Sequence, residues 1–180
     1  MRALLLIMAM LPLFANALAI TTGAKLPTIQ VNSSGFITVV NDEIQYQAWD
    51  SNSLNGKVYL IQAMAGRTSA KEINAPMIEA VKQAKLSSDQ YQTVTIVNTS
   101  DAVFGTSGFV KSKLKNNAKD FPNAAFIQDD KGQVTKKWKL AKKSNAIILL
   151  DKQGNVLFAK DGALNAQEIE EVMSLIKSNI

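Results

Sequence analysis

The stretch VYLIQAMAGRTSAKEINAPM, residues 58–77, joins two kinds of secondary structure. Its first part, VYLIQAMA, is an almost continuous apolar run, which is typical of a strand buried on both faces of a sheet. After Gly66 the apolar residues recur at helical spacing, which predicts an amphipathic helix of about four turns. Its apolar stripe consists of Ile73, Met77, Ala80, Val81 and Ala84. We expect a kink near residues 72–76, because Pro76 removes one backbone hydrogen bond there.

The segments that follow extend this strand and helix into a mixed α/β fold. Residues 91–98, YQTVTIVN, predict a second buried strand, and a helix is expected from about Ser107 to the sequence DFP. A short strand and a short helix or turn bearing Trp138 come next. Residues 145–162, NAIILLDKQGNVLFAKDG, predict a β-hairpin. Strands joined through helices lie parallel and hairpin strands lie antiparallel, so the central sheet should be mixed.

Further elements are predicted before and after these segments. GFITVV and EIQYQAW flank the polar pair Asn41–Asp42, which predicts an N-terminal β-hairpin after an extended lead-in over residues 20–34. At the other end, Asn165 is expected to cap a last helix, with Glu168 completing a capping box. Residues 20–180 contain no internal repeat, so we expect a single domain.

The first 19 residues, MRALLLIMAMLPLFANALA, have the features of a secretory signal peptide. Arg2 precedes an apolar run that is well short of the roughly 20 residues needed to span a bilayer. Ala17 and Ala19 have the small-residue spacing that a signal peptidase recognises, so we expect cleavage after Ala19. The mature product would then be soluble, without a stable membrane anchor.

The sequence contains neither cysteine nor histidine. The first absence excludes disulfides and thiolate chemistry, and the second removes the usual general base and the commonest metal ligand. Asp129 and Asp130 read as an exposed turn, because a calcium loop would show more alternating acidic positions. We therefore expect no metal and no cofactor.

The predicted order of elements resembles the thioredoxin fold. SLNGKVYLIQAMA and NAIILLDKQGNVLFAKDG are similar to the first central strand and the hairpin of periplasmic thioredoxin-like oxidoreductases. The segments AGRTSAKE, YQTVTIVNTSDA and LDKQGNVLFAKDGAL, together with the signal peptide, resemble the YtfJ family of periplasmic thioredoxin-fold proteins. This resemblance implies the fold and a periplasmic location, and no established activity.

The resemblance also indicates which residues stand at the positions of the redox site. With Glu72 placed on the glutamate of the oxidoreductase motif, Gly66 and Ser69 stand where the two cysteines would be. Asn145 falls on the position of the family's cis-proline, where we expect an ordinary trans peptide. Thiol–disulfide exchange needs an attacking and a resolving thiol, so the chain should not be a thiol-disulfide oxidoreductase.

The sequence GRTSAKE, residues 66–72, is the first candidate binding site. The helix start at Gly66, the hydroxyls of Thr68 and Ser69 and the guanidinium of Arg67 could together hold a small anion. The alternative is structural: Thr68 or Ser69 caps the helix, Glu72 completes a capping box and Arg67 is solvated.

NTSD, residues 98–101, follows the second central strand and should lie beside the 66–69 loop. Asn98, Thr99 and Asp101 could complete a polar pocket at the carboxyl ends of the strands, where open α/β sheets bind ligands. The same four residues are also a good turn and cap sequence.

Residues 131–143, KGQVTKKWKLAKK, combine a run of lysines with Trp138. Such a segment can bind nucleic acid, lipid or glycan, but a secreted protein rarely meets nucleic acid. The alternative is a solvated lysine face with Trp138 packed inward.

Three hypotheses of function remain at this stage. The first is a non-redox periplasmic protein that binds a small anion or a periplasmic protein between residues 66–69 and the 98–105 loop. The second is an enzyme of unknown class that uses Arg67, Ser69 and Glu72 on an anionic substrate, and the third is a chaperone-like accessory protein.

Overall fold

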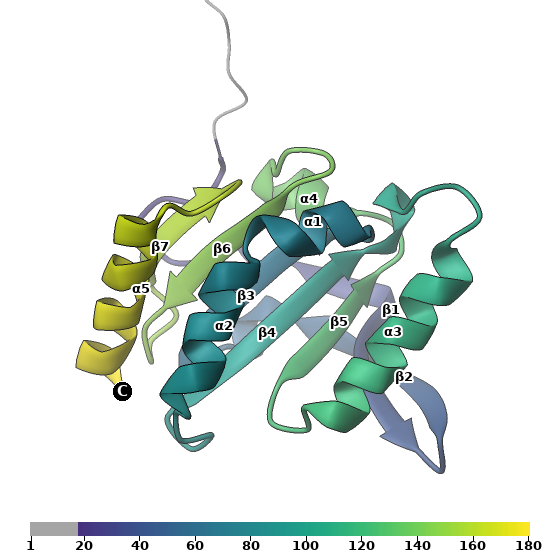
Figure 1. Cartoon of the computed structure of the whole chain (residues 1–180), viewed down its shortest axis with the longest axis horizontal. Helices are drawn as coiled ribbons and strands as arrows, with labels where there is room; N and C mark the ends of the chain where they lie inside the picture. Colours follow the sequence, from purple (N-terminus) through teal and green to yellow (C-terminus); the bar gives the residue numbers. More distant parts are fainter. Residues whose placement is uncertain (1–17) are drawn as a thin grey trace, which may run out of the picture.

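The computed structural model describes residues 18–180, in which the strands form one seven-stranded sheet (Figure 1). The strands are β1 (Gln30–Val40), β2 (Glu43–Asp50), β3 (Val58–Ala65), β4 (Tyr91–Asn98), β5 (Ala125–Asp129), β6 (Asn145–Leu150) and β7 (Val156–Asp161). Their order across the sheet is β2-β1-β5-β4-β3-β6-β7. β3, β4 and β5 are parallel and the outer strands antiparallel, so the predicted mixed sheet is confirmed. Residues 1–17 of the predicted signal peptide lie outside the described residues.

The crossover from β3 to β4 is broken into two helices, α1 (Thr68–Ile73) and α2 (Ala75–Ala84). Asn74 stands between them, and Pro76 occupies the first turn of α2. Proline is tolerated there because the first-turn amides have no partner within the helix. The predicted kink is therefore confirmed in position, but it is a complete break and not a bend in one helix.

The remaining elements follow the predicted order. They are the short helix η2 (Thr99–Asp101), α3 (Ser107–Asp120), α4 (Gln133–Trp138) and α5 (Ala166–Asn179). The predicted capping box of α5 is confirmed, since Asn165 accepts from the Glu168 amide and Glu168 accepts from the Asn165 amide. Hydrogen bonding to Lys160 holds the pKa of Glu168 below its usual value. No helix in the described part of the chain is both long and apolar enough to span a bilayer.

The N-terminal hairpin extends the sheet beyond β5. Asn41 and Asp42 both adopt positive φ, as the tight turn between β1 and β2 requires. β1 begins at Gln30, earlier than expected, and its register shifts between Val31 and Phe36. At the tip, Asp42 pairs with Lys115 and Lys119 of α3. Hydrogen bonds and charge from these lysines lower the pKa of Asp42.

The core lies on both faces of the sheet. One face packs against α2, α5 and α3, which stand in front of the strands in Figure 1. The opposite face packs against α4 and the segment that leads into β1. Trp138 of α4 is fully buried there, and its indole nitrogen donates to the Pro27 carbonyl over 2.8 Å. The inward-packing interpretation of Trp138 is therefore confirmed.

Candidate functional site

Arg67 and Asp101 are joined at the carboxyl ends of β3 and β4. The Arg67 guanidinium donates to the Asp101 carbonyl over 3.0 and 2.7 Å and also pairs with its carboxylate. The other carboxylate oxygen accepts from the Lys143 amide over 2.7 Å. The two side chains are only 17% and 18% exposed. The interpretation of Arg67 as a solvated residue is therefore wrong, and its guanidinium is already engaged by a carboxylate.

The start of α1 differs from both interpretations of GRTSAKE. The N-cap residue is Arg67, its side chain makes no capping bond, and no capping box forms with Glu72. Thr68, Ser69 and Glu72 are exposed, and among the described residues no hydrogen bond joins Ser69 to Arg67 or Glu72. Two contacts instead fix how the chain enters α1. The Gly66 amide donates to the Asn98 carbonyl, and the Arg67 side chain is hydrogen-bonded to Asp101. The predicted cap is therefore wrong, because contacts with η2 replace it.

Gly66 packs directly against the end of β4. A Cβ atom at this position would lie 2.9 Å from the Asn98 carbonyl oxygen and 3.2 Å from the Thr99 Cα. Both neighbours are backbone atoms and cannot rotate away. The position aligned with a redox cysteine therefore has no room for a side chain unless the backbone shifts.

Asn98 is a structural residue in this arrangement. Its side-chain oxygen accepts from the Ser100 amide and hydroxyl over 3.0 and 2.6 Å, and its nitrogen donates to Thr135 over 3.0 Å. It is buried and caps η2, which contains Thr99 and Asp101. The turn and cap interpretation of NTSD is thus the one that the geometry supports.

Asn145 lies in a buried amide network beneath the break between α1 and α2. Its side-chain nitrogen donates to the Ala70 carbonyl over 2.9 Å. Asn74 donates to the carbonyls of Asn145 and Gly162 over 2.9 and 3.0 Å, and accepts from the Leu164 amide over 3.0 Å. As expected for Asn145, the described residues contain no cis peptide bond. The side-chain oxygen of Asn145 has no hydrogen-bond partner among them.

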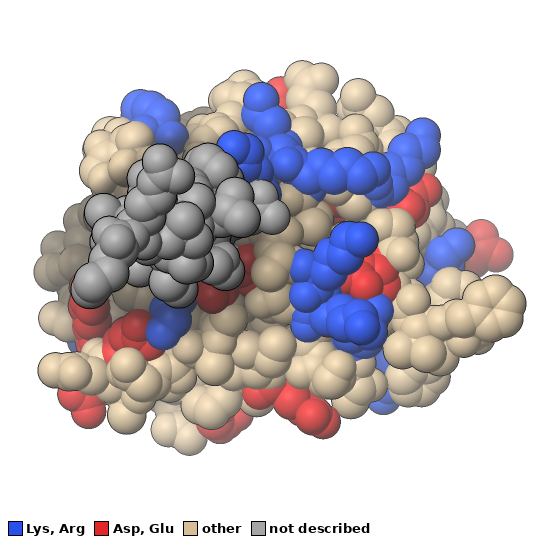
Figure 2. All heavy atoms as spheres, turned by 90° about the horizontal axis from the view of Figure 1, so that it is seen from above, with Lys and Arg blue, Asp and Glu red and all other residues tan. Residues whose placement is uncertain are grey.

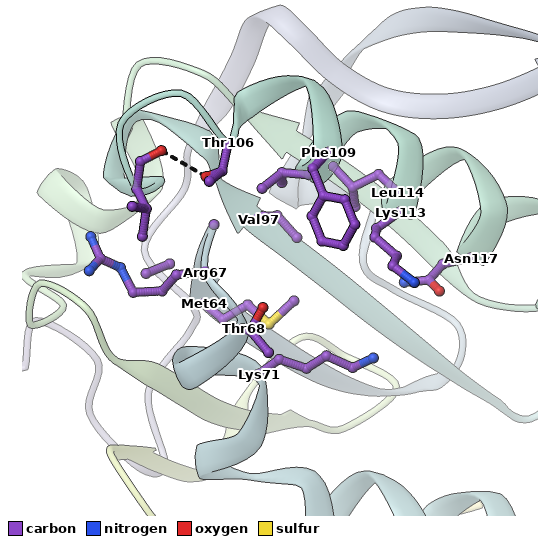
Figure 3. A pocket seen from close by; sticks show the side chains of 14 residues that line it. Met64, Arg67, Thr68, Lys71, Val97, Thr106, Phe109, Lys113, Leu114 and Asn117 are labelled. Atoms are coloured by element: carbon purple, nitrogen blue, oxygen red, sulfur yellow. Dashed lines mark hydrogen bonds between the residues drawn. The ribbon is translucent and has the colours of Figure 1, made fainter.

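An open groove lies between α1 and α3, over the ends of β3 and β4 (Figure 3). Its volume is about 490 Å³, within the range of small-molecule sites. We call it the α1–α3 groove, and it is lined by Met64, Ala65, Gly66, Arg67, Thr68, Lys71, Val97, Val103, Thr106, Phe109, Val110, Lys113, Leu114 and Asn117. Seven of these fourteen residues have apolar side chains.

Of the candidate site residues predicted from the sequence, only Gly66, Arg67 and Thr68 line this groove. Ser69, Glu72, Asn98, Thr99, Asp101 and Asn145 do not line it. The one signal for the rest is the sequence around α3, where Val103 and Phe104 just before the helix and Phe109 within it place apolar side chains in a polar segment. All three are exposed, and Phe104 is fully so.

Basic side chains surround this end of the molecule. In Figure 2, which shows the molecule from above, Lys and Arg gather over the upper surface. The lysines of residues 131–143 are all exposed, as the solvated interpretation of that segment predicts; they are Lys131, Lys136, Lys137, Lys139, Lys142 and Lys143. Within residues 18–180, no three Asp, Glu, His or Cys side chains gather where they could hold a metal ion.

Residues 20–179 match the family described as "Bacterial protein of unknown function (YtfJ_HI0045)". The chain belongs to this family. "Uncharacterized protein YtfJ" of Escherichia coli strain K12 is 46% identical over 168 residues, which cover 93% of this chain and 91% of the relative. An uncharacterized protein of Haemophilus influenzae is 40% identical over 152 residues, covering 84% and 83%.

Solved structures with a similar fold are much more distant in sequence. The C-terminal domain of a putative thiol-disulfide oxidoreductase from Bacteroides thetaiotaomicron has a TM-score of 0.61 and 18% identity, over 90% of this chain and 99% of that one. A putative thiol:disulfide interchange protein DsbE from Chlorobium tepidum has a TM-score of 0.56 and 17% identity, over 89% and 98%. These similarities show that this YtfJ-family chain has the thioredoxin-like fold.

Proposed function

We propose that the chain is exported to the periplasm, cleaved after Ala19, and acts there as a non-redox binding protein through the α1–α3 groove. The observation that carries the proposal is the groove itself, an open apolar hollow beside the position where a thioredoxin-like enzyme would hold its first cysteine. Exposed apolar surface is costly in water, so its concentration at one place favours a binding role.

Two features support the non-redox part of the proposal. The sequence contains no cysteine, and the packing of Gly66 against Asn98 and Thr99 leaves no space for a side chain. Ser69, at the second aligned position, is exposed and has no histidine to activate it. The same geometry disfavours an enzyme built on Arg67, Ser69 and Glu72, because Arg67 is held by Asp101 and no side-chain hydrogen bond joins these three among the described residues.

The groove can be tested with a neutral apolar dye such as N-phenyl-1-naphthylamine, titrated into residues 20–180. We expect a saturable rise in fluorescence that the Phe109→Ser variant largely loses, since Phe109 lines the groove and is 60% exposed. The matched control is Phe121→Ser, which removes a 43% exposed phenylalanine from a different hollow. Equal dye binding by the wild type and Phe109→Ser, with both folded, would overturn the groove as the binding site.

The location is tested separately by expressing the full chain and fractionating the cells. We expect the product in the periplasmic fraction, with a mass that corresponds to a chain starting at Ile20. Uncleaved protein in the cytoplasm would contradict the proposed export.

A further inference from the structure

The α1–α3 groove has a different charge at each end. In Figure 3, the ammonium groups of Lys71 and Lys113 lie toward the end where Asn117 lies, and Arg67 lies at the opposite end. Arg67 is neutralised by Asp101. Lys71 and Lys113 have no carboxylate within ion-pair distance among the described residues. The groove therefore combines an apolar floor with two uncompensated positive charges at one end.

We propose that the ligand of this groove is a single-chain amphiphile with an anionic head group, such as a fatty acid. The proposal rests on the binding function proposed above and names its ligand class. The acyl chain lies along the groove, and the head group lies between the Lys71 and Lys113 ammonium groups, near the Asn117 amide.

The lining fits an acyl chain better than a compact anion. Met64, Val103, Phe109 and Val110 present apolar surface, which an inorganic ion or a small sugar would not cover. Burial of an alkyl chain against them removes apolar area from water on both sides, which favours binding. A polar ligand would gain little from this floor.

The cationic end explains why the head group should be negative. The Lys113 ammonium lies over the Phe109 ring, 5.4 Å from its centroid, so the ring orients this charge at the rim of the groove. Lys71 projects from α1 on the facing side. A carboxylate placed between them would gain two charge-assisted contacts that a neutral alcohol cannot make.

The test is displacement of the bound neutral dye by decanoate, decanol and acetate, each below the concentration at which micelles form. We expect decanoate to displace the dye at about tenfold lower concentration than decanol, the size expected for two exposed ion pairs. Acetate should not displace it, and added salt should reduce the advantage of decanoate. In the Lys71→Gln/Lys113→Gln variant, decanoate and decanol should become equivalent.

The control variant Lys111→Gln/Lys137→Gln loses the same net charge from exposed positions outside the groove and should keep the preference for decanoate. Equal displacement by decanoate and decanol in the wild type would overturn the anionic head group while leaving the binding function intact. An apolar peptide that displaces the dye more strongly than decanoate would make the ligand a polypeptide and overturn the proposal. Absence of dye binding would instead contradict the proposed function itself.

Discussion

Two neighbouring regions lie at the carboxyl ends of β3 and β4 and the amino end of β6, and they differ in how far their side chains have hydrogen-bond or charge partners. In the polar cluster, which we define as Arg67, Asn74, Asn98, Asp101 and Asn145, nearly every donor and acceptor has a partner within the chain. In the α1–α3 groove, apolar side chains remain open to solvent and two lysines have no counter-ion among the described residues. The residues of the polar cluster thus stabilise the fold, whereas apolar side chains of the groove remain exposed beside them.

This difference shows how to separate structural from functional polar residues in such a fold. A buried polar group with partners stabilises the chain, and its removal leaves those partners unsatisfied. A binding residue contributes little to the folded state, so its removal changes affinity and not stability.

The largest effect is expected for Asn74→Ala. The Asn74 side chain makes three hydrogen bonds to buried or partly buried backbone groups at the start of β6 and in the loop after β7, all of which the alanine would lose. We expect a loss of about 3 kcal/mol in the free energy of unfolding, measured by urea denaturation. Asn116→Ala, on the exposed side of α3, is the matched control and should change it by less than about 0.5 kcal/mol. A small effect of Asn74→Ala would remove the argument that the polar cluster is structural.

Gly66→Ala should have the next largest effect. The added methyl group would meet the Asn98 carbonyl and the Thr99 backbone, and we expect a loss of about 2 kcal/mol from overpacking. Gly108→Ala is the control, because a Cβ at this helical position meets nothing within 4 Å. That control should gain up to about 1 kcal/mol from helix propensity. Thermal unfolding of the two variants measures the contrast, and an equally tolerated Gly66→Ala would show that position 66 is not closed.

A smaller effect is expected from the Arg67–Asp101 pair. A double-mutant cycle with Arg67→Ala and Asp101→Ala should give a coupling energy of about 1 kcal/mol, because the pair is only partly exposed. Arg67→Ala should leave dye binding in the groove nearly unchanged, because the guanidinium is paired with Asp101 at the end of the groove opposite Lys71 and Lys113. If Arg67→Ala abolished dye binding and the cycle gave no coupling energy with Asp101, Arg67 would be a ligand-binding residue and not a structural member of the polar cluster.

The smallest effect on stability is expected in the loop before α3, where Phe104 follows the groove residue Val103. Phe104 is fully exposed, so Phe104→Ser should change the free energy of unfolding by less than about 0.5 kcal/mol. A large destabilisation, measured by urea denaturation, would mean that this side chain is packed in solution. The loop before α3 would then be packed against the fold and not a free surface.

The regular elements could be predicted from the sequence because their signals are local. The apolar runs of β3, β4 and β6 and the helical spacing in α2 are contained in single segments, and Pro76 marked the break between α1 and α2. The same kind of cap signal was right for α5 and wrong for α1. At α5 the box closes within the helix, whereas at α1 partners more than thirty positions away, Asn98 and Asp101, fix the chain.

The groove could not be predicted for the same reason. Its lining comes from two strands, two helices and the loops before those helices, so Met64, Val97 and Val110 are neighbours only after folding. Each of them fits a strand or helix stripe in the sequence and looks like ordinary core. Polar residues at strand ends are predicted from the sequence as a binding site, but the sequence does not show which hydrogen-bond partners they have in the fold.

Under the proposed export, the packing of Ala19 and Ile20 sets the order of two events, namely signal cleavage and folding. The Ala19 amide donates to the Trp138 carbonyl over 3.0 Å, and Ile20 is buried in the core beside α4. A peptidase that cuts after Ala19 needs these residues extended and accessible, which the folded domain does not allow. Under the proposed export, the cut must therefore come before Ile20 packs against α4, so maturation of the chain precedes completion of its fold.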